Sequence, residues 1–270
     1  MGCSFAEGYH ELLSSFALRQ DPIPVIDRQR LSRGICLSHQ GGKIHRVRST
    51  IPISQLSKQI EASLAEIAHA LDELGATGIG LMTGYGNRWL GHPDFAPVLA
   101  ELDRRGAAVH VHPRAPPCCA GMIQSNPWGA SALLEFPFDT GRTMFDLLQS
   151  GALRRYPHIR WIFSHLGGVI PFLAGRLRDV GPGFWLDLDT VAPEGIDHEF
   201  RRLHYDTAAC ANAPAMQAGL AYLPASQMLF GTDHPHYDVA GTVDNFSRLG
   251  LADGVAETIQ RDNPRRLLRL

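Results

Sequence analysis

The strongest constraint on the fold of this chain is a regular alternation of helix-like and strand-like segments from about residue 60 onward. The apolar residues of 60–74 recur at helical spacing, and Gly75 supplies a natural C-terminal stop. Residues 78–84 (GIGLMTG) then have the composition of a buried strand. Alternation of this kind requires crossover connections, and it therefore predicts a parallel sheet.

The same unit recurs four more times along the chain. Further strands are predicted at 107–113, 159–165, 203–208 and 227–233. Helices are predicted over 95–105 (ended by Gly106), over 140–153, in a stretch that ends near Arg178, and over 216–223. Five consecutive units fit either a (β/α) barrel or a doubly wound sheet.

The polar residues at the strand ends favour the barrel. His112, His165, Asp206 and Asp233 each lie at or just past the C-terminal end of a different predicted strand. A closed parallel barrel gathers such ends around one opening. No Gly-rich phosphate loop follows any strand, because the Gly84-Tyr85-Gly86 sequence lacks the required third glycine. The expected fold class is therefore α/β, a TIM-type (β/α)8 barrel.

The first 58 residues do not follow this alternation. Residues 5–18 could form an amphipathic helix, and short strands are predicted at 23–26, 34–38 and 50–53. The sequence between them is basic and irregular, and no low-complexity linker marks a second domain. We therefore divide the chain into a divergent N-terminal segment, residues 1–58, and a barrel domain, residues 59–270.

Composition limits the class of protein and of partner. The 25 Lys and Arg against 27 Asp and Glu leave a formal charge of −2, which argues against nucleic acid as a partner. The hydrophobic fraction of 44% is enough for a sizeable core. The sequence has no apolar run near the ~20 residues of a membrane span, so neither an anchor nor a signal peptide is expected. Five sparse cysteines fit a reducing compartment, and we expect a cytoplasmic protein.

Two histidines at the end of the 107–113 strand are candidate metal ligands. His112 ends a buried strand, where a neutral imidazole is a good zinc ligand, although a hydrogen-bonded core or rim histidine is the more ordinary interpretation of one isolated histidine. His110 lies two residues earlier and therefore on the same face of the strand. We expect His112 to be the ligand and His110, deeper in the packed interior, to support it.

His165 and Asp233 add proton-transfer chemistry to this set. His165 precedes a Gly-Gly turn, where it could act as an acid or base near neutral pH or serve only as a turn residue. Asp233 could bind a metal or take a proton, or it could cap a helix. Three separate strands that end in His, His and Asp together predict a mononuclear metal centre with a histidine acid/base.

Four motifs in this order resemble a known family. VHVHP with His112, FSHLGG with His165, HYDTA with Asp206 and LFGTDHPH with Asp233 resemble the amidohydrolase-related (amidohydrolase 2) family. The similar branch contains the aminocarboxymuconate-semialdehyde, γ-resorcylate and 6-methylsalicylate decarboxylases. Residues 112–119 and 133–177 resemble the 6-methylsalicylate members in particular, and the resemblance covers about residues 60 to 270.

The resemblance implies a (β/α)8 barrel of the metal-dependent hydrolase superfamily and roles for four residues. It implies one divalent metal, commonly zinc, with His112 and Asp233 as ligands, and His165 as the catalytic acid/base. Asp233 would share in the proton transfer. Arg176 would reach a substrate carboxylate across a homodimer interface, which suits a guanidinium. The ordinary alternative for Arg176 is a surface ion pair.

The implied activity is nonoxidative decarboxylation of a small aromatic or muconate-like carboxylic acid, with neither nucleic acid nor membrane as a partner. Two alternatives remain open. A hydrolase could use the same ligands with a metal-bound water. An inactive paralogue or fragment would explain why no His-x-His pair of the family's first strand precedes His110. An aromatic substrate wall could come from Phe136, Phe138, Trp128 or Trp161.

Overall fold

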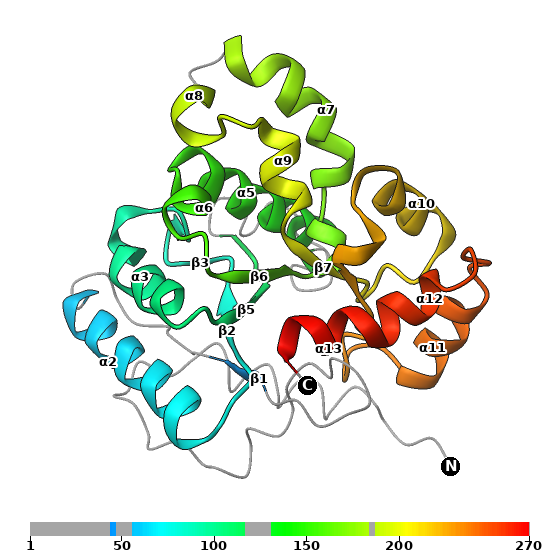
Figure 1. Ribbon diagram of the computed structural model, residues 1–270, viewed down its shortest axis with the longest axis horizontal. Helices are drawn as coiled ribbons and strands as arrows, with labels where there is room; N and C mark the ends of the chain where they lie inside the picture. Colours follow the sequence, from blue (N-terminus) through cyan, green and yellow to red (C-terminus); the bar gives the residue numbers. More distant parts are fainter. Residues whose placement is uncertain (1–43, 47–55, 117–130, 184–186, 270) are drawn as a thin grey trace. The chain divides into compact units, whose positions relative to one another are not determined.

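One parallel sheet organises the described part of the chain (Figure 1). The computed structural model describes residues 44–46, 56–116, 131–183 and 187–269. Six strands lie in the order β1-β2-β5-β6-β7-β8, and each pair of neighbours is parallel. Their bounds are β1 Ile44–Arg46, β2 Gly78–Met82, β5 Ala108–His112, β6 Arg160–Phe163, β7 His204–Asp206 and β8 Met228–Leu229.

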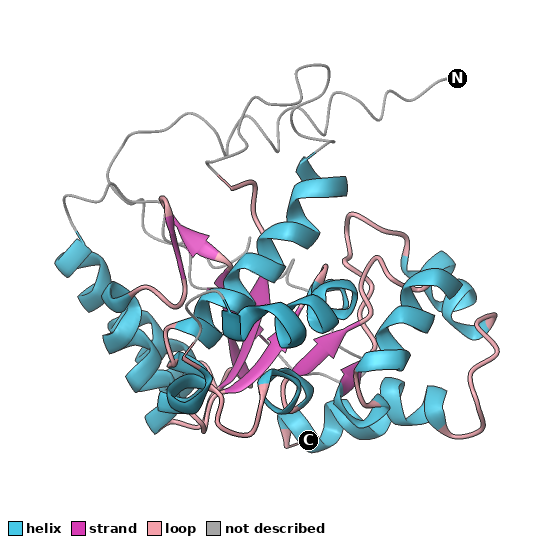
Figure 2. Cartoon of the chain, turned by 90° about the horizontal axis from the view of Figure 1, so that it is seen from above, coloured by secondary structure: helices cyan, strands magenta, loops and turns pink. Residues whose placement is uncertain are grey.

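Helices connect successive strands and pack around them (Figure 2). Two left-handed glycines follow helices as the sequence predicts, Gly75 with φ +61° and Gly106 with φ +55°. The α-helices are α2 Leu56–Ala68, α3 Ala96–Arg104, α5 Phe136–Gln149, α6 Ala152–Arg155, α7 Ile170–Val180, α8 Leu188–Val191, α9 Ile196–Arg201, α10 Ala213–Tyr222, α11 Val239–Ser247, α12 Val255–Glu257 and α13 Asn263–Leu268. Single turns of 3-10 or π-helix are η2 His69–Glu73, η3 Pro93–Phe95, η5 Ser131–Glu135, η6 His165–Gly167, η7 Gly181–Gly183, η8 Ala225–Gln227 and η9 Thr258–Asp262.

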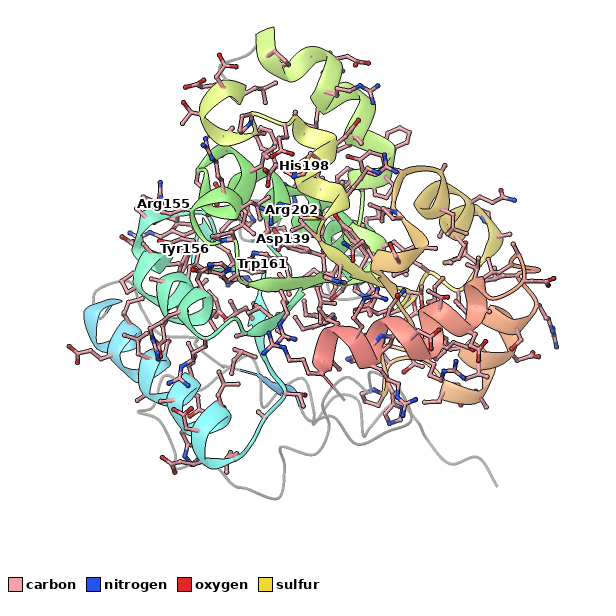
Figure 3. All side chains as sticks on the ribbon, in the orientation of Figure 1. Asp139, Arg155, Tyr156, Trp161, His198 and Arg202 are labelled. Carbon is pink, nitrogen blue, oxygen red and sulfur yellow. The ribbon has the colours of Figure 1, made fainter. Side chains whose placement is uncertain are left out.

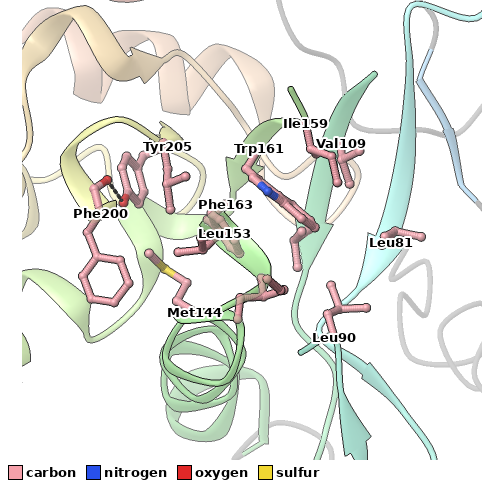
Figure 4. Packing of buried hydrophobic residues seen from close by; sticks show 14 of the residues in the cluster. Leu81, Leu90, Val109, Met144, Leu153, Ile159, Trp161, Phe163, Phe200 and Tyr205 are labelled. Atoms are coloured by element: carbon pink, nitrogen blue, oxygen red, sulfur yellow. Dashed lines mark hydrogen bonds between the residues drawn. The ribbon is translucent and has the colours of Figure 1, made fainter. Parts of the chain in front are cut away.

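The main hydrophobic core lies between the sheet and the helices on its outer face (Figure 4). Alternate strand residues supply one side of this core, with Val109, Trp161 and Tyr205 on three neighbouring strands. Helix residues such as Met144 and Leu153 supply the other side. Because side chains alternate along a strand, the residues between these point to the opposite, inner face.

That inner face carries the polar residues of interest. Ile162 and Leu229 form a small separate cluster with Leu267 of α13. His110 aligns with Ile162, and Asp206 aligns with Leu229, so both polar residues share the inner face with this cluster. The strand pattern therefore brings His110 and Asp206 to one side of the sheet and leaves the aromatic core on the other.

The observed elements confirm the five predicted strand and helix units and the parallel α/β fold. The sequence missed β1, which contains His45, and a short antiparallel hairpin formed by β3 Gly84–Tyr85 and β4 Arg88–Trp89. The predicted helix over 5–18 and the strands at 23–26, 34–38 and 50–53 lie outside the described residues. The division of the chain at residue 58 stays a prediction. Within the described ranges, no helix has the length and apolarity needed to cross a membrane.

Candidate metal centre and active site

Three residues from three strand ends converge at the carboxyl edge of the sheet. His112 ends β5, His165 follows β6 within η6, and Asp233 lies on the loop after β8. One potential ligand atom from each lies within 4.8 Å of the other two, and the described residues contain no second group of this kind. The structure thus brings together the three residues that the sequence singled out, from positions 121 residues apart in the chain.

The backbone at two of these residues is left-handed. His165 has φ +56° and Asp233 has φ +59°, values that non-glycine residues adopt at an energetic cost. The turn after His165 is closed by Gly167, where an added Cβ would lie 2.8 Å from the Tyr205 ring. Asp233 caps no helix, because the N-cap of α11 is Asp238, whose carboxylate accepts from the Gly241 N–H. The side chains of His165 and Asp233 therefore both project from left-handed turns, not from the strands or α-helices of the fold.

The distances within the group suit ligands of one ion better than they suit direct hydrogen bonds. Asp233 Oδ1 lies 3.6 Å from His112 Nε2, and Asp233 Oδ2 lies 3.6 Å from His165 Nε2. Two donors bound at about 2.1 Å in tetrahedral geometry would stand about 3.4 Å apart. The rings of His112 and His165 meet edge to face with centroids 5.4 Å apart.

The tautomer of His112 also fits a metal ligand. Its Nδ1 donates to the Pro113 carbonyl oxygen at 2.8 Å. The Nε2 lone pair is therefore turned toward Asp233, and a metal-bound histidine is commonly oriented in this way by a backbone carbonyl. Imidazole nitrogen and carboxylate oxygen are both good ligands for a divalent ion. The donor set present thus fits the group that the family resemblance implies.

The electrostatics of the group favour an ionised Asp233 beside a protonated His165. Burial acts to raise the pKa of Asp233, but the neighbouring His112 and His165 side chains outweigh it and hold that pKa well below the usual range. For His165, burial acts to lower the pKa, yet the neighbouring Asp233 carboxylate and the charge of Asp206 raise it overall. His165 can therefore hold a proton near neutral pH.

His110 does not join the three converging residues. Its Nε2 lies 2.8 Å from Asp206 Oδ2, and both side chains are 1% exposed. Because a carboxylate only accepts, Nε2 carries the proton and offers no lone pair to a metal. Burial acts to raise the pKa of Asp206, but the hydrogen bond from His110 and the charges of His110 and His165 lower it overall. The alternation of His110 and His112 indicated their shared face, but it could not reveal this partner on β7.

The other predicted residues, Arg176 and four aromatic residues, do not share one location in the structure. Arg176 is exposed on α7, and no hydrogen bond or ion pair joins it to another residue in the described part of the chain. The Phe136 ring meets the His112 ring edge to face, with centroids 6.1 Å apart, whereas Phe138 is exposed. Trp161 stacks on Phe163 in the outer core, so the expectation that it lines the site is wrong. Trp128 lies outside the described residues.

A second buried carboxylate lies near the end of β2. Asp139 of α5 accepts hydrogen bonds from the Thr83 hydroxyl and from Trp89 Nε1, the latter at 2.8 Å (Figure 3). Thr143 on the same helix donates to the Thr83 carbonyl oxygen at 2.6 Å. These bonds attach α5 and the β3-β4 hairpin to the carboxyl edge of the sheet. The sequence had not indicated this network, since its members lie about fifty residues apart.

Comparison with known proteins places the chain in a family. A family described as Amidohydrolase matches residues 53–270. The 6-methylsalicylic acid decarboxylase of Aspergillus aculeatus is 36% identical over 211 residues, which cover 74% of this chain and 63% of that protein. The chain therefore spans less than two thirds of the length of this relative.

Two solved structures share the fold. A 2,6-dihydroxybenzoate decarboxylase in complex with 2,6-dihydroxybenzoate has a TM-score of 0.71 and 22% identity, over 79% of this chain and 68% of that one. A dihydroxybenzoic acid decarboxylase from Polaromonas, with bound manganese and 2-nitroresorcinol, has a TM-score of 0.68 and 20% identity, over 78% of this chain and 66% of that one. These matches confirm the barrel-type α/β fold, and with the match over residues 53–270 they show that the chain belongs to the amidohydrolase family.

Proposed function

We propose that this protein is a metal-dependent decarboxylase that releases carbon dioxide from a small aromatic carboxylic acid, of the 6-methylsalicylate or dihydroxybenzoate type. The observation that carries the proposal is the convergence of His112, His165 and Asp233 within 4.8 Å. The names of the relatives support the reaction class and the aromatic substrate.

His112 and Asp233 would hold a divalent ion. When bound, such an ion supplies positive charge that stabilises a substrate oxygen as negative charge develops. An imidazole nitrogen and a carboxylate oxygen both suit zinc, which we propose as the resident metal. Manganese in the Polaromonas structure makes Mn²⁺ the ion to compare with it.

His165 would deliver the proton that replaces the carboxyl group. In the balanced reaction, the bond between the ring carbon and the carboxylate breaks and carbon dioxide leaves. The ring carbon takes one proton from His165 Nε2, and solvent then returns a proton to the imidazole. Asp233 favours the protonated form of His165, because its carboxylate acts to raise the pKa of that imidazole. The edge of Phe136 beside His112 provides an apolar surface for an aromatic ring.

Arg176 would act in a homodimer. Its guanidinium is exposed on α7 and has no partner among the described residues, so it is free to reach a carboxylate in the site of a second copy. This role is the part of the proposal that depends on assembly, and it can be tested apart from the chemistry.

The test is a product assay on the full chain. Purified protein is incubated with Zn²⁺ or Mn²⁺ and with 6-methylsalicylate or 2,6-dihydroxybenzoate, and carbon dioxide and the phenolic product are quantified together. We expect equal amounts of both products, and we expect a chelator to abolish them. Stoichiometric metal without any carbon dioxide would reject the decarboxylase, and release of acid plus alcohol or amine from ester or amide substrates would indicate a hydrolase instead.

A further inference from the structure

The proposed reaction leaves one buried, hydrogen-bonded His–Asp pair without a role. His110 on β5 and Asp206 on β7 lie on either side of β6, and neither belongs to the converging group. We propose that Asp206, held by His110, is a positioning residue that fixes the left-handed backbone at His165 and so places its imidazole against Asp233. This inference rests on the proposed function, because it assigns His165 the proton transfer.

The first step of the argument is the set of groups that Asp206 accepts from. Its Oδ1 takes the backbone N–H of His165 at 3.0 Å and that of Ala208 at 3.0 Å. Its Oδ2 takes His110 Nε2 at 2.8 Å. One carboxylate thus ties the His165 turn to the end of β7 through three donors in a buried environment.

The second step concerns the backbone that this carboxylate holds. His165 and Leu166 have φ of +56° and +53°, and neither is a glycine. Two consecutive left-handed residues of this kind persist only where surrounding contacts enforce them. The first of these two left-handed residues, His165, donates its backbone N–H to Asp206. Without that acceptor, a buried N–H would lack a partner and the turn could relax.

The third step explains why His110 is needed. A buried carboxylate is costly unless it is paired, and His110 supplies the donor to Oδ2, the oxygen that the His165 N–H does not use. Ser164 lies 3.4 Å from His110 Nε2 through its Oγ, which also donates to the Val111 carbonyl oxygen at 2.8 Å. The pair is thereby attached to β5 and to the residue that precedes His165.

The fourth step links Asp206 to the loop that bears Asp233. A Cβ added at Gly231 would lie 3.1 Å from the Cβ of Asp206 and 3.2 Å from its Cγ. Gly231 also donates its N–H to Thr207 Oγ1 at 3.2 Å. Asp206 therefore packs between the two turns whose side chains face each other, and a displacement at Asp206 would change the spacing between His165 and Asp233.

The experiment compares two variants of Asp206 in the metal-loaded full chain. Asp206→Ala removes the acceptor for both backbone N–H groups, and we expect kcat to fall about a hundredfold with KM changed less than about threefold, as for a misplaced reacting group. Asp206→Asn keeps an acceptor oxygen for the turn, and we expect it to restore kcat to within about tenfold of the wild type. Metal content should stay unchanged in both variants.

A matched control separates positioning from general stability. Glu199 of α9 is also a buried carboxylate, and it pairs with Arg202 at 2.6 Å. Glu199→Ala should lower the melting temperature yet leave kcat within about twofold, because it touches no residue of the site. If Asp206→Ala lowers kcat no more than Glu199→Ala does, the positioning role is wrong.

A second readout needs no activity. Histidine labelled with ¹³C at Cε1 gives an NMR signal for His165, assigned by its loss in His165→Gln. We expect Asp206→Ala and His110→Gln to shift or broaden that signal, and Glu199→Ala to leave it unchanged. An unchanged His165 signal in both site variants overturns the positioning role even where the enzyme is active. A shifted signal in a chain without decarboxylase activity supports positioning while the proposed function fails. Should Asp206→Ala not fold, Asp206→Asn and His110→Gln carry the same comparison.

Discussion

The buried His165 and the partly buried His204, at opposite ends of neighbouring strands, have pKa values that move in opposite directions. His165 follows the carboxyl end of β6, and nearby carboxylates raise its pKa despite burial. His204 begins β7 at the amino end, and burial lowers its pKa to about 4. The Trp161 backbone opposes that shift, while the charges of Arg266 and Arg160 add to it. The imidazole is the same in both places, so its neighbours decide whether it holds a proton.

This contrast concerns the two edges of one sheet. At the carboxyl edge, Asp233 and Asp206 raise the pKa of His165 against the effect of burial, whereas at the other edge burial and the charges of Arg266 and Arg160 lower the pKa of His204. In parallel βα folds the loops at the carboxyl ends carry function, and the opposite ends serve stability. The predictions below test this separation, from the largest expected effect to the smallest.

The largest effect is expected at His165. We predict that His165→Ala lowers kcat about 10²- to 10⁴-fold, because it removes the proton donor, and leaves metal content unchanged. The measurement is turnover together with metal analysis of the purified variant. His204→Ala should change kcat little and serves as the control at the opposite end of the sheet. Loss of metal from His165→Ala would mean that His165 is a ligand rather than the acid.

A second large effect is expected at Asp233. Asp233→Asn keeps the shape of the side chain but removes its charge, so both metal content and turnover should fall, with turnover reduced about 10²- to 10³-fold. Metal analysis and kcat measure the two losses. The control is Asp238→Asn on the same loop, which keeps an acceptor for the cap of α11 and should leave both metal content and turnover unchanged. A variant that keeps stoichiometric metal would contradict the ligand role of Asp233.

The third prediction concerns His204 and stability. Its pKa is about 4 in the folded protein against 6.5 in its unperturbed state. Between these values the unfolded chain binds a proton that the folded chain does not, so the free energy of unfolding should fall as pH falls, by about 3 kcal/mol near pH 4. His165 acts in the opposite sense, because its stabilising contribution is present below pH 6.5 and is lost as pH rises through its raised pKa.

Urea unfolding at pH 7 and at pH 4.5 measures this slope. His204→Gln should flatten the loss of stability on acidification, whereas substitution of the exposed His236 by Gln should leave it as in the wild type. If the free energy of unfolding falls equally between pH 7 and pH 4.5 in all three proteins, His204 does not control the loss of stability in acid.

The smallest effect is expected at Arg176. Arg176→Lys keeps the charge but loses the planar fork, so KM should rise about tenfold with kcat nearly unchanged, if the residue binds a carboxylate across a dimer. Arg178→Lys is the matched control, because Arg178 lies on the same helix and already pairs with Asp179 and Asp197. A monomer by analytical ultracentrifugation, or an unchanged KM, would remove Arg176 from the site.

The sequence by itself determined the βα units and the edge of the sheet that carries the chemistry. Strand polarity makes this possible, since a residue just after a parallel strand must lie at its carboxyl end. His112, His165 and Asp233 were therefore predictable as neighbours, and the structure brings them within 4.8 Å. The motifs around them were specific enough as a set to indicate the family that the comparison confirms.

Only the tertiary structure decided which side chains pair with one another at that edge of the sheet. Alternation shows that His110 and His112 share a face, but it cannot show that His110 meets Asp206, 96 residues away, while His112 meets Asp233. It also could not tell that Trp161 faces the outer core rather than the site. Left-handed backbone at His165 and Asp233 is likewise invisible in the sequence, because no glycine marks those positions. These features depend on cross-strand register and on contacts between distant turns, and local sequence encodes neither.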